Sequence, residues 1–159
     1  TRWLKRAYQA LKAGNPRCMV GAGVLDYHSK ITDGWRYIQG IYDEGGGAFF
    51  DAIDIHPYAP REIHWRAVGD TRSVMCAAGD DRKPIWIDEF GWPYPNGPEY
   101  GDDLRRVVDR FARPEYDYVT LARYLVVTDL NDGQFGLCDI DLNPRPIYTA
   151  FRDIVRGSR

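Results

Sequence analysis

The sequence has few cysteines and no excess of charge of either sign. Its 159 residues include three cysteines and three histidines, without a C-x-x-C pair or an H-E-x-x-H pattern, which argues against zinc-ribbon and thioredoxin-type sites. The formal net charge is −2 and no basic stripe is present, so we expect no nucleic-acid partner. No apolar run approaches the roughly 20 residues that span a bilayer, so we expect no membrane-spanning segment.

A glycine-rich phosphate loop is also missing from the sequence. Gly45, Gly46 and Gly47 precede a predicted strand instead of opening a helix, and we interpret them as the end of a helix. This argues against a doubly wound nucleotide-binding fold.

What the chain does contain is enough apolar sequence for a folded core. It is 44% hydrophobic and 14% aromatic, far from the composition of disordered chains. Because the sequence starts at Thr1 inside a predicted helix, we expect residues 1–159 to be one partial domain of a longer chain.

Apolar periodicity predicts strands that alternate with helices, which indicates parallel α/β architecture. The predicted strands are 18–23, 52–58, 84–90 and 122–128. The predicted helices are 3–11, 35–42, 62–78, 104–111 and 147–155.

Residues suited to catalysis stand at the ends of two predicted strands, where parallel α/β folds collect function. The strand 52–58 ends in His56 and Tyr58, and the strand 84–90 carries Glu89 near its end. If the faces that carry them line a barrel interior, these three side chains converge on one opening. A strand-end carboxylate suits nucleophilic or acid/base work, although Glu89 could also be a salt-bridged group and His56 and Tyr58 could be structural.

Strict alternation also assigns the neighbours of these residues to faces. It places Glu89 with Ile85 and Ile87, and it places Asp88 on the opposite face with Trp86 and Phe90, the two aromatics packing under the outer helices. Asp54 lies one layer deeper than His56, and we interpret it as a hydrogen-bonded structural carboxylate because a buried charge needs partners.

Residues 84–92, Pro-Ile-Trp-Ile-Asp-Glu-Phe-Gly-Trp, resemble the seventh-strand signature of clan A glycoside hydrolases, the retaining (β/α)8-barrel glycosidases. Residues 53–58 resemble their sixth strand, 3–19 their fourth helix and fifth strand, and 143–151 the approach to their eighth helix. The family 39 and family 5 branches are nearest. The resemblance implies an α/β fold that is the C-terminal half of a (β/α)8 TIM barrel, strands five to eight, with the N-terminal half missing from view.

The resemblance implies a site as well as a fold. Glu89 would be the nucleophile, Tyr58 would orient it and His56 would bind a sugar hydroxyl, with a carbohydrate substrate and no metal or organic cofactor. The acid/base Glu, usually after Asn, would lie upstream of Thr1, since no Asn-Glu pair occurs in the chain. Enzymes of this kind that act on polysaccharides are usually exported, which favours a secreted or periplasmic location.

Four further residues are candidates for substrate binding. Trp92 and Tyr94 lie in a predicted loop and could stack on a sugar or simply pack there, and Tyr27 and Asn131 follow the strands 18–23 and 122–128. Two departures from the family pattern stand out: Asp88 occupies a position where Ser or Thr is common, and the strand 122–128 lacks the Trp that many members place in it.

Two other functions stay open at this point. The first is a catalytically silent carbohydrate-binding barrel, which keeps the aromatic residues and lacks the acid/base. The second is a metal-dependent barrel hydrolase with His28, His56 and Asp54 as ligands, although no paired-histidine spacing supports it.

Overall fold

The four strands of the chain form one parallel sheet. In the computed structural model, which describes residues 1–27, 34–58, 61–93, 95–129 and 134–157, the spatial order of the strands is their order in the sequence. An unreversed order with a helix after each strand is that of a barrel wall, whereas a doubly wound sheet reverses its order. The strands are β1 (Gly21–Tyr27), β2 (Ala52–Pro57), β3 (Ile85–Phe90) and β4 (Val119–Tyr124).

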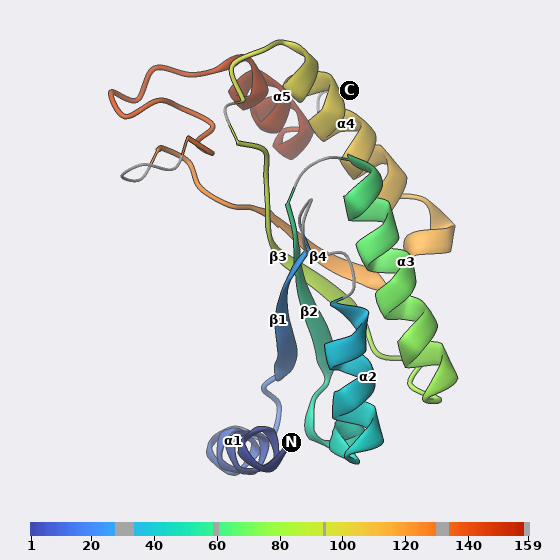
Figure 1. Cartoon of the computed structure of the whole chain (residues 1–159). Coiled ribbons are helices and arrows are strands. Elements are labelled where there is room, and N and C mark those ends of the chain that lie inside the picture. The colour runs from blue at the N-terminus through green and yellow to red at the C-terminus, as the bar shows by residue number, and fades with distance from the viewer. Residues whose placement is uncertain (28–33, 59–60, 94, 130–133, 158–159) are drawn as a thin grey trace.

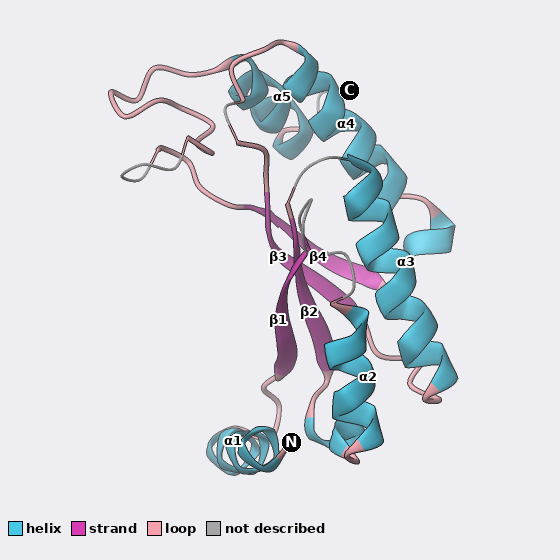
Figure 2. Cartoon of the chain, viewed as in Figure 1, coloured by secondary structure: helices cyan, strands magenta, loops and turns pink. Residues whose placement is uncertain are grey.

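Helices α2 and α3 lie along one face of this sheet, and α4 and α5 pack against each other near the carboxyl end of β3 (Figures 1 and 2). None of the described helices combines the length and the hydropathy needed to cross a bilayer. The α-helices are α1 (Arg2–Gly14), α2 (Trp35–Asp43), α3 (Arg61–Ala77), α4 (Glu99–Phe111) and α5 (Pro146–Val155), with short 3-10 helices η1 (Gly46–Phe49) and η2 (Pro114–Tyr116).

Two strands are displaced from their predicted positions. β1 starts at Gly21 instead of residue 18, and β4 ends at Tyr124 instead of residue 128. The apolar residues after Tyr124 mimic a continuing strand, but the carbonyl groups of Val126 and Val127 accept hydrogen bonds from the backbone N–H groups of Leu137 and Cys138. This segment therefore leaves the sheet and pairs with the loop that follows it.

The apolar core lies between the sheet and the helices. Ile53 and Ile55 of β2, and Ile85 and Ile87 of β3, are completely buried there. They pack with buried residues of the covering helices, which include Ile38, Ile41, Ala67, Val68 and Met75. The prediction that Ile85 and Ile87 share the inner face with Glu89 is therefore wrong, because these isoleucines face the helices.

Trp86 lies on the opposite, inner face of the sheet. It is the register partner of Asp54, and a Cβ added at Gly21 of β1 would lie 3.0 Å from the Trp86 ring and 3.8 Å from the Asp54 Cβ. The prediction that Trp86 packs under the outer helices is wrong, because β3 turns that side chain toward the barrel interior. Phe90, by contrast, is 4% exposed and belongs to the core under the helices, as predicted.

β1 approaches β2 closely beside Asp54. Gly23 has a φ of +128°, and a Cβ added there would lie 2.4 Å from the Asp54 carbonyl oxygen. Glycine alone accommodates both the dihedral angle and the contact. The pairing register of β1 with β2 shifts between Gly23 and Leu25, which marks a bulge at this point.

An ion pair fixes the loop between β4 and α5. The Arg145 guanidinium donates from Nη1 and Nη2 to both Asp129 carboxylate oxygens, at 2.8 and 2.6 Å, and from Nη1 to the Gly136 carbonyl oxygen at 2.8 Å. The backbone N–H of Gly136 donates to the same Asp129 carboxylate. Bonding to Arg145 lowers the pKa of Asp129, so this carboxylate serves the loop as a structural anion.

Candidate active site

A bulge in β3 brings two acidic side chains to the same side of the sheet. Ile87 pairs with Ala122 and Phe90 with Tyr124, so β3 advances by one residue more than β4 between these pairs. Such an extra residue interrupts the alternation of side chains. The prediction that Asp88 and Glu89 lie on opposite faces is therefore wrong, because both carboxylates contact the same imidazole, that of His56.

Glu89, His56 and Tyr58 come together at the carboxyl end of the sheet. The Tyr58 hydroxyl donates a short hydrogen bond to Glu89 Oε2, and His56 Nδ1 lies 3.4 Å from the same oxygen. The Glu89 side chain is 38% exposed, so a ligand can reach it. Phe135 closes one side of the Tyr58 ring with an edge contact, at 5.8 Å between ring centroids.

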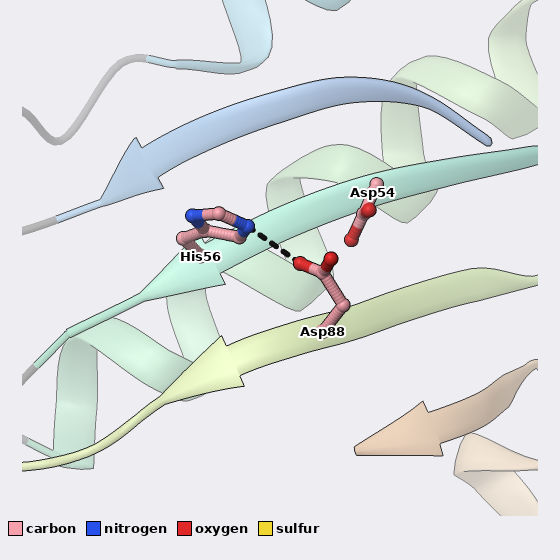
Figure 3. A group of neighbouring side chains, drawn as sticks. All are labelled: Asp54, His56 and Asp88. Carbon is pink, nitrogen blue, oxygen red and sulfur yellow. Dashed lines mark hydrogen bonds and ion pairs between the residues drawn. The ribbon is translucent and has the colours of Figure 1, made fainter. Parts of the chain in front are cut away.

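On the side of its ring away from Glu89, His56 is bound to a second carboxylate, that of Asp88. His56 Nε2 lies 2.5 Å from Asp88 Oδ1 (Figure 3). Because Nδ1 of the same ring lies near Glu89, the imidazole stands between Asp88 and Glu89. The His56 side chain is 9% exposed and that of Asp88 is 31% exposed. Sequence reasoning missed Asp88 as a site residue; its one signal was the replacement of the usual Ser or Thr.

Asp54 is the most deeply placed acid of the site. It is 7% exposed, and its Oδ1 is buried without a hydrogen-bond partner among the residues that the structure describes. Its carboxyl group faces that of Asp88 (Figure 3). Burial, and then the Asp88 carboxylate, raise the pKa of Asp54 from 3.8 to about 6. Asp54 is thus buried as expected, but it faces a second acid.

Replacing Asp54 with asparagine is expected to remove a pH-dependent part of the free energy of unfolding. A carboxyl group whose pKa is higher in the folded state stabilises the fold fully below pH ~4, and this contribution is lost as the pH rises through ~6. Relative to Asp54→Asn, the wild type should therefore lose about 3 kcal/mol between pH ~4 and ~7. Urea unfolding of both proteins across this range measures the difference, and parallel pH profiles would contradict the placement of Asp54.

Asp54, His56 and Asp88 are also the described residues whose ligand atoms could hold a metal ion. One atom from each lies within 4.8 Å of the others, a set of two oxygens and one nitrogen. In the structure His56 Nε2 is bound to Asp88, so a cation would have to replace that contact. His28, the third ligand of the metal-dependent hypothesis, lies outside the described residues.

Of the four residues predicted to bind sugar, the structure describes the side chain of Trp92 alone. Trp92 is 3% exposed, and its ring packs against Phe90, Tyr100 and Tyr124 with centroids 6.1 to 6.4 Å apart. This placement corresponds to the packing alternative and leaves no open ring face for a sugar. Tyr94 and Asn131 lie outside the described residues, as does the side chain of Tyr27, whose backbone ends β1.

Comparison with known proteins gives the class of the fold. The sequence matches no protein-family model and no curated protein. Solved structures, however, show that the chain forms part of a (β/α)8 barrel of the kind found in clan A glycoside hydrolases. The prediction of the fold class is confirmed.

Three similar structures illustrate this likeness. A monomeric β-xylosidase from Caulobacter crescentus has a TM-score of 0.73 at 14% identity, over 95% of this chain and 36% of its own. A family 39 enzyme from Xanthomonas axonopodis pv. citri scores 0.72 at 14% identity, over 98% of this chain and 36% of its own. An endo-β-1,4-mannanase from Thermotoga petrophila scores 0.59 at 15% identity, over 98% and 39%. The chain thus spans little more than a third of these proteins.

Proposed function

We propose that this chain is the C-terminal half of the catalytic barrel of a retaining glycoside hydrolase, with Glu89 as the nucleophile. The observation that carries the proposal is the Glu89 carboxylate, which is open to solvent and held by Tyr58 and His56 at the carboxyl end of the sheet. Active sites of (β/α)8 barrels form at this end. The fold shared with a β-xylosidase and a β-mannanase supports a β-linked oligo- or polysaccharide as the substrate.

The proposed reaction is a double displacement at the anomeric carbon. Glu89 attacks that carbon as the glycosidic bond to the leaving oxygen breaks, and a glycosyl ester on Glu89 forms. Water then cleaves the ester and restores the carboxylate. Because Tyr58 and His56 both contact Oε2, the other oxygen, Oε1, is the atom we assign to the attack.

The acid/base carboxylate of this reaction would come from outside the described chain. It must protonate the leaving oxygen, and in retaining enzymes it stands about 5–5.5 Å from the nucleophile with the substrate between them. Asp88 does not meet this need, because it neighbours Glu89 in the same strand and is bound to His56. We therefore place the acid/base on strand four, in the N-terminal half of the barrel.

Covalent labelling of the complete barrel tests the proposal. An activated 2-deoxy-2-fluoro glycoside reacts with the nucleophile and leaves a sugar ester that hydrolyses slowly. Peptide mass spectrometry should find one sugar per barrel, on Glu89. A label on any other carboxylate, or turnover with no trapped ester, would overturn the assignment. Binding of oligosaccharides without labelling or turnover would favour the silent carbohydrate-binding barrel.

A further inference from the structure

The His56 ring connects two carboxylates with its two nitrogens. Nε2 lies 2.5 Å from Asp88 Oδ1, and Nδ1 lies 3.4 Å from Glu89 Oε2. The contact of Nε2 with Asp88 fixes the orientation of the ring, and this orientation turns Nδ1 toward Glu89.

Asp54 adds a further carboxyl group directly behind Asp88. The two groups face each other (Figure 3), and Asp54 Oδ1 is buried without a hydrogen-bond partner among the described residues. Their ligand oxygens lie within 4.8 Å, and two carboxylates this close, one of them buried, do not both ionise readily, so such a pair favours retention of a proton. The upward direction of the Asp54 pKa agrees with this.

The described ionisable side chains around this pair come from β2, β3 and the residue that follows β2. β2 contributes His56 beside Asp54, Tyr58 follows directly after β2, and β3 contributes Asp88 and Glu89; on β1 the backbone of Asp26 is in register with His56, and its side chain lies outside the described part of the structure. Asp54 is the most buried acid among those whose side chains are described, which makes it the member of the pair that is hardest to ionise.

We propose that Asp54 and Asp88 share one proton that resides on Asp54, and that the ionised Asp88 is a positioning residue which holds His56 against Glu89. The catalytic part of this inference rests on the proposed function of Glu89. The proton pair itself rests only on the side chains of the inner face. A divalent cation among Asp54, His56 and Asp88 is the competing arrangement, and it is disfavoured because Asp88 already occupies Nε2 of His56.

The shared proton predicts different effects for two matched variants, Asp54→Asn and Asp88→Asn, in the complete barrel. Asparagine is similar in shape to a protonated aspartate and carries no charge. If the proton resides on Asp54, Asp54→Asn should keep kcat within about threefold of the wild type when both are measured below pH ~6, where Asp54 is protonated. Asp88→Asn removes the charge that orients His56, and it should lower kcat at least about 100-fold with KM within twofold. Asp109→Asn, on the exposed side of α4, controls for the loss of a carboxylate.

The pH profile and a spectroscopic measurement separate positioning from general damage. In Asp88→Asn the acid limb of kcat/KM should move to higher pH, and Asp88→Glu should recover part of kcat. The ¹⁵N NMR spectrum of the His56 ring, which needs no substrate, should be the same in Asp54→Asn as in the wild type and should differ in Asp88→Asn at the same pH. The NMR result therefore tests the pair even if the barrel hydrolyses no sugar.

Several results would overturn the inference. Equal losses in the two asparagine variants would do so, as would a wild-type His56 spectrum in Asp88→Asn. Loss of activity with a chelator and its recovery with Mn²⁺ or Zn²⁺ would establish the cation site instead. If Asp88→Asn fails to fold, Asp88→Ser, which carries the residue common at this position in similar enzymes, gives the same comparison.

Discussion

Glu89→Gln in the complete barrel is expected to lower kcat at least about 1,000-fold, to the background of the assay. Glutamine keeps the size of the side chain and can still bond to the Tyr58 hydroxyl. Its amide, however, is a poor nucleophile and cannot form the glycosyl ester. Because the substrate still meets the same pocket, KM or the dissociation constant should change little. Initial rates with an aryl glycoside, together with binding measured by calorimetry, separate the two effects.

Two comparisons make this prediction specific to the chemistry. Glu115→Gln changes a glutamate of η2 whose side chain is 60% exposed, and it should retain wild-type kcat. Glu89→Gly opens space for azide, which should restore turnover of an activated substrate and give a glycosyl azide of inverted configuration. Retention of more than a tenth of wild-type activity by Glu89→Gln would remove Glu89 from the role of nucleophile.

The sequence predicted the alternation of strands and helices because that pattern is local. Apolar spacing located β2 and β3 to within a residue or two of their ends, and the resemblance to the second half of a barrel implied the order of the strands. The predicted fourth strand was placed too far along the chain because the apolar residues 125–127 look like part of a strand. Their pairing with Leu137 and Cys138 is a contact between segments that no periodicity reveals.

The candidate site was predictable in its members and not in its geometry. The strand-end rule and the motif identified Glu89, His56 and Tyr58, which the structure places in contact. The bulge of β3 has no glycine or proline to mark it, so strict alternation turned Asp88 away from the site. The sequence likewise left the role of Trp92 open, because the same loop sequence allows an aromatic ring to pack in the core or to stack on a sugar; the structure buries it.

The chain alone is expected to show no glycosidase activity and to associate in solution. β1 and β4 are the edges of the sheet, and each pairs with one neighbour only in the described structure. Beside β4 lies an apolar cavity of about 620 Å³, lined by Phe90, Leu104, Phe111, Tyr124, Phe151 and other residues of α4 and α5. Open strand edges and apolar surface of this kind favour pairing with another chain.

In a closed barrel both features would have occupants. The first and fourth strands of an N-terminal half would pair with β4 and β1, and the helices of that half would cover the apolar cavity. The same half would bring the acid/base carboxylate to Glu89. Adding it as a separate chain should therefore convert associated material into a one-to-one complex and create activity in the same step.

Size-exclusion chromatography with light scattering, followed by assay of each fraction, measures both effects. An N-terminal segment whose acid/base carboxylate is replaced by its amide is the matched control, because it should restore the one-to-one complex without restoring turnover. Full activity of the monomeric 159-residue chain would show that the site is complete without a partner half. If the two halves form the one-to-one complex but show no activity with the carboxylate in place, the closure of the barrel would be supported and the proposed glycosidase activity would be contradicted.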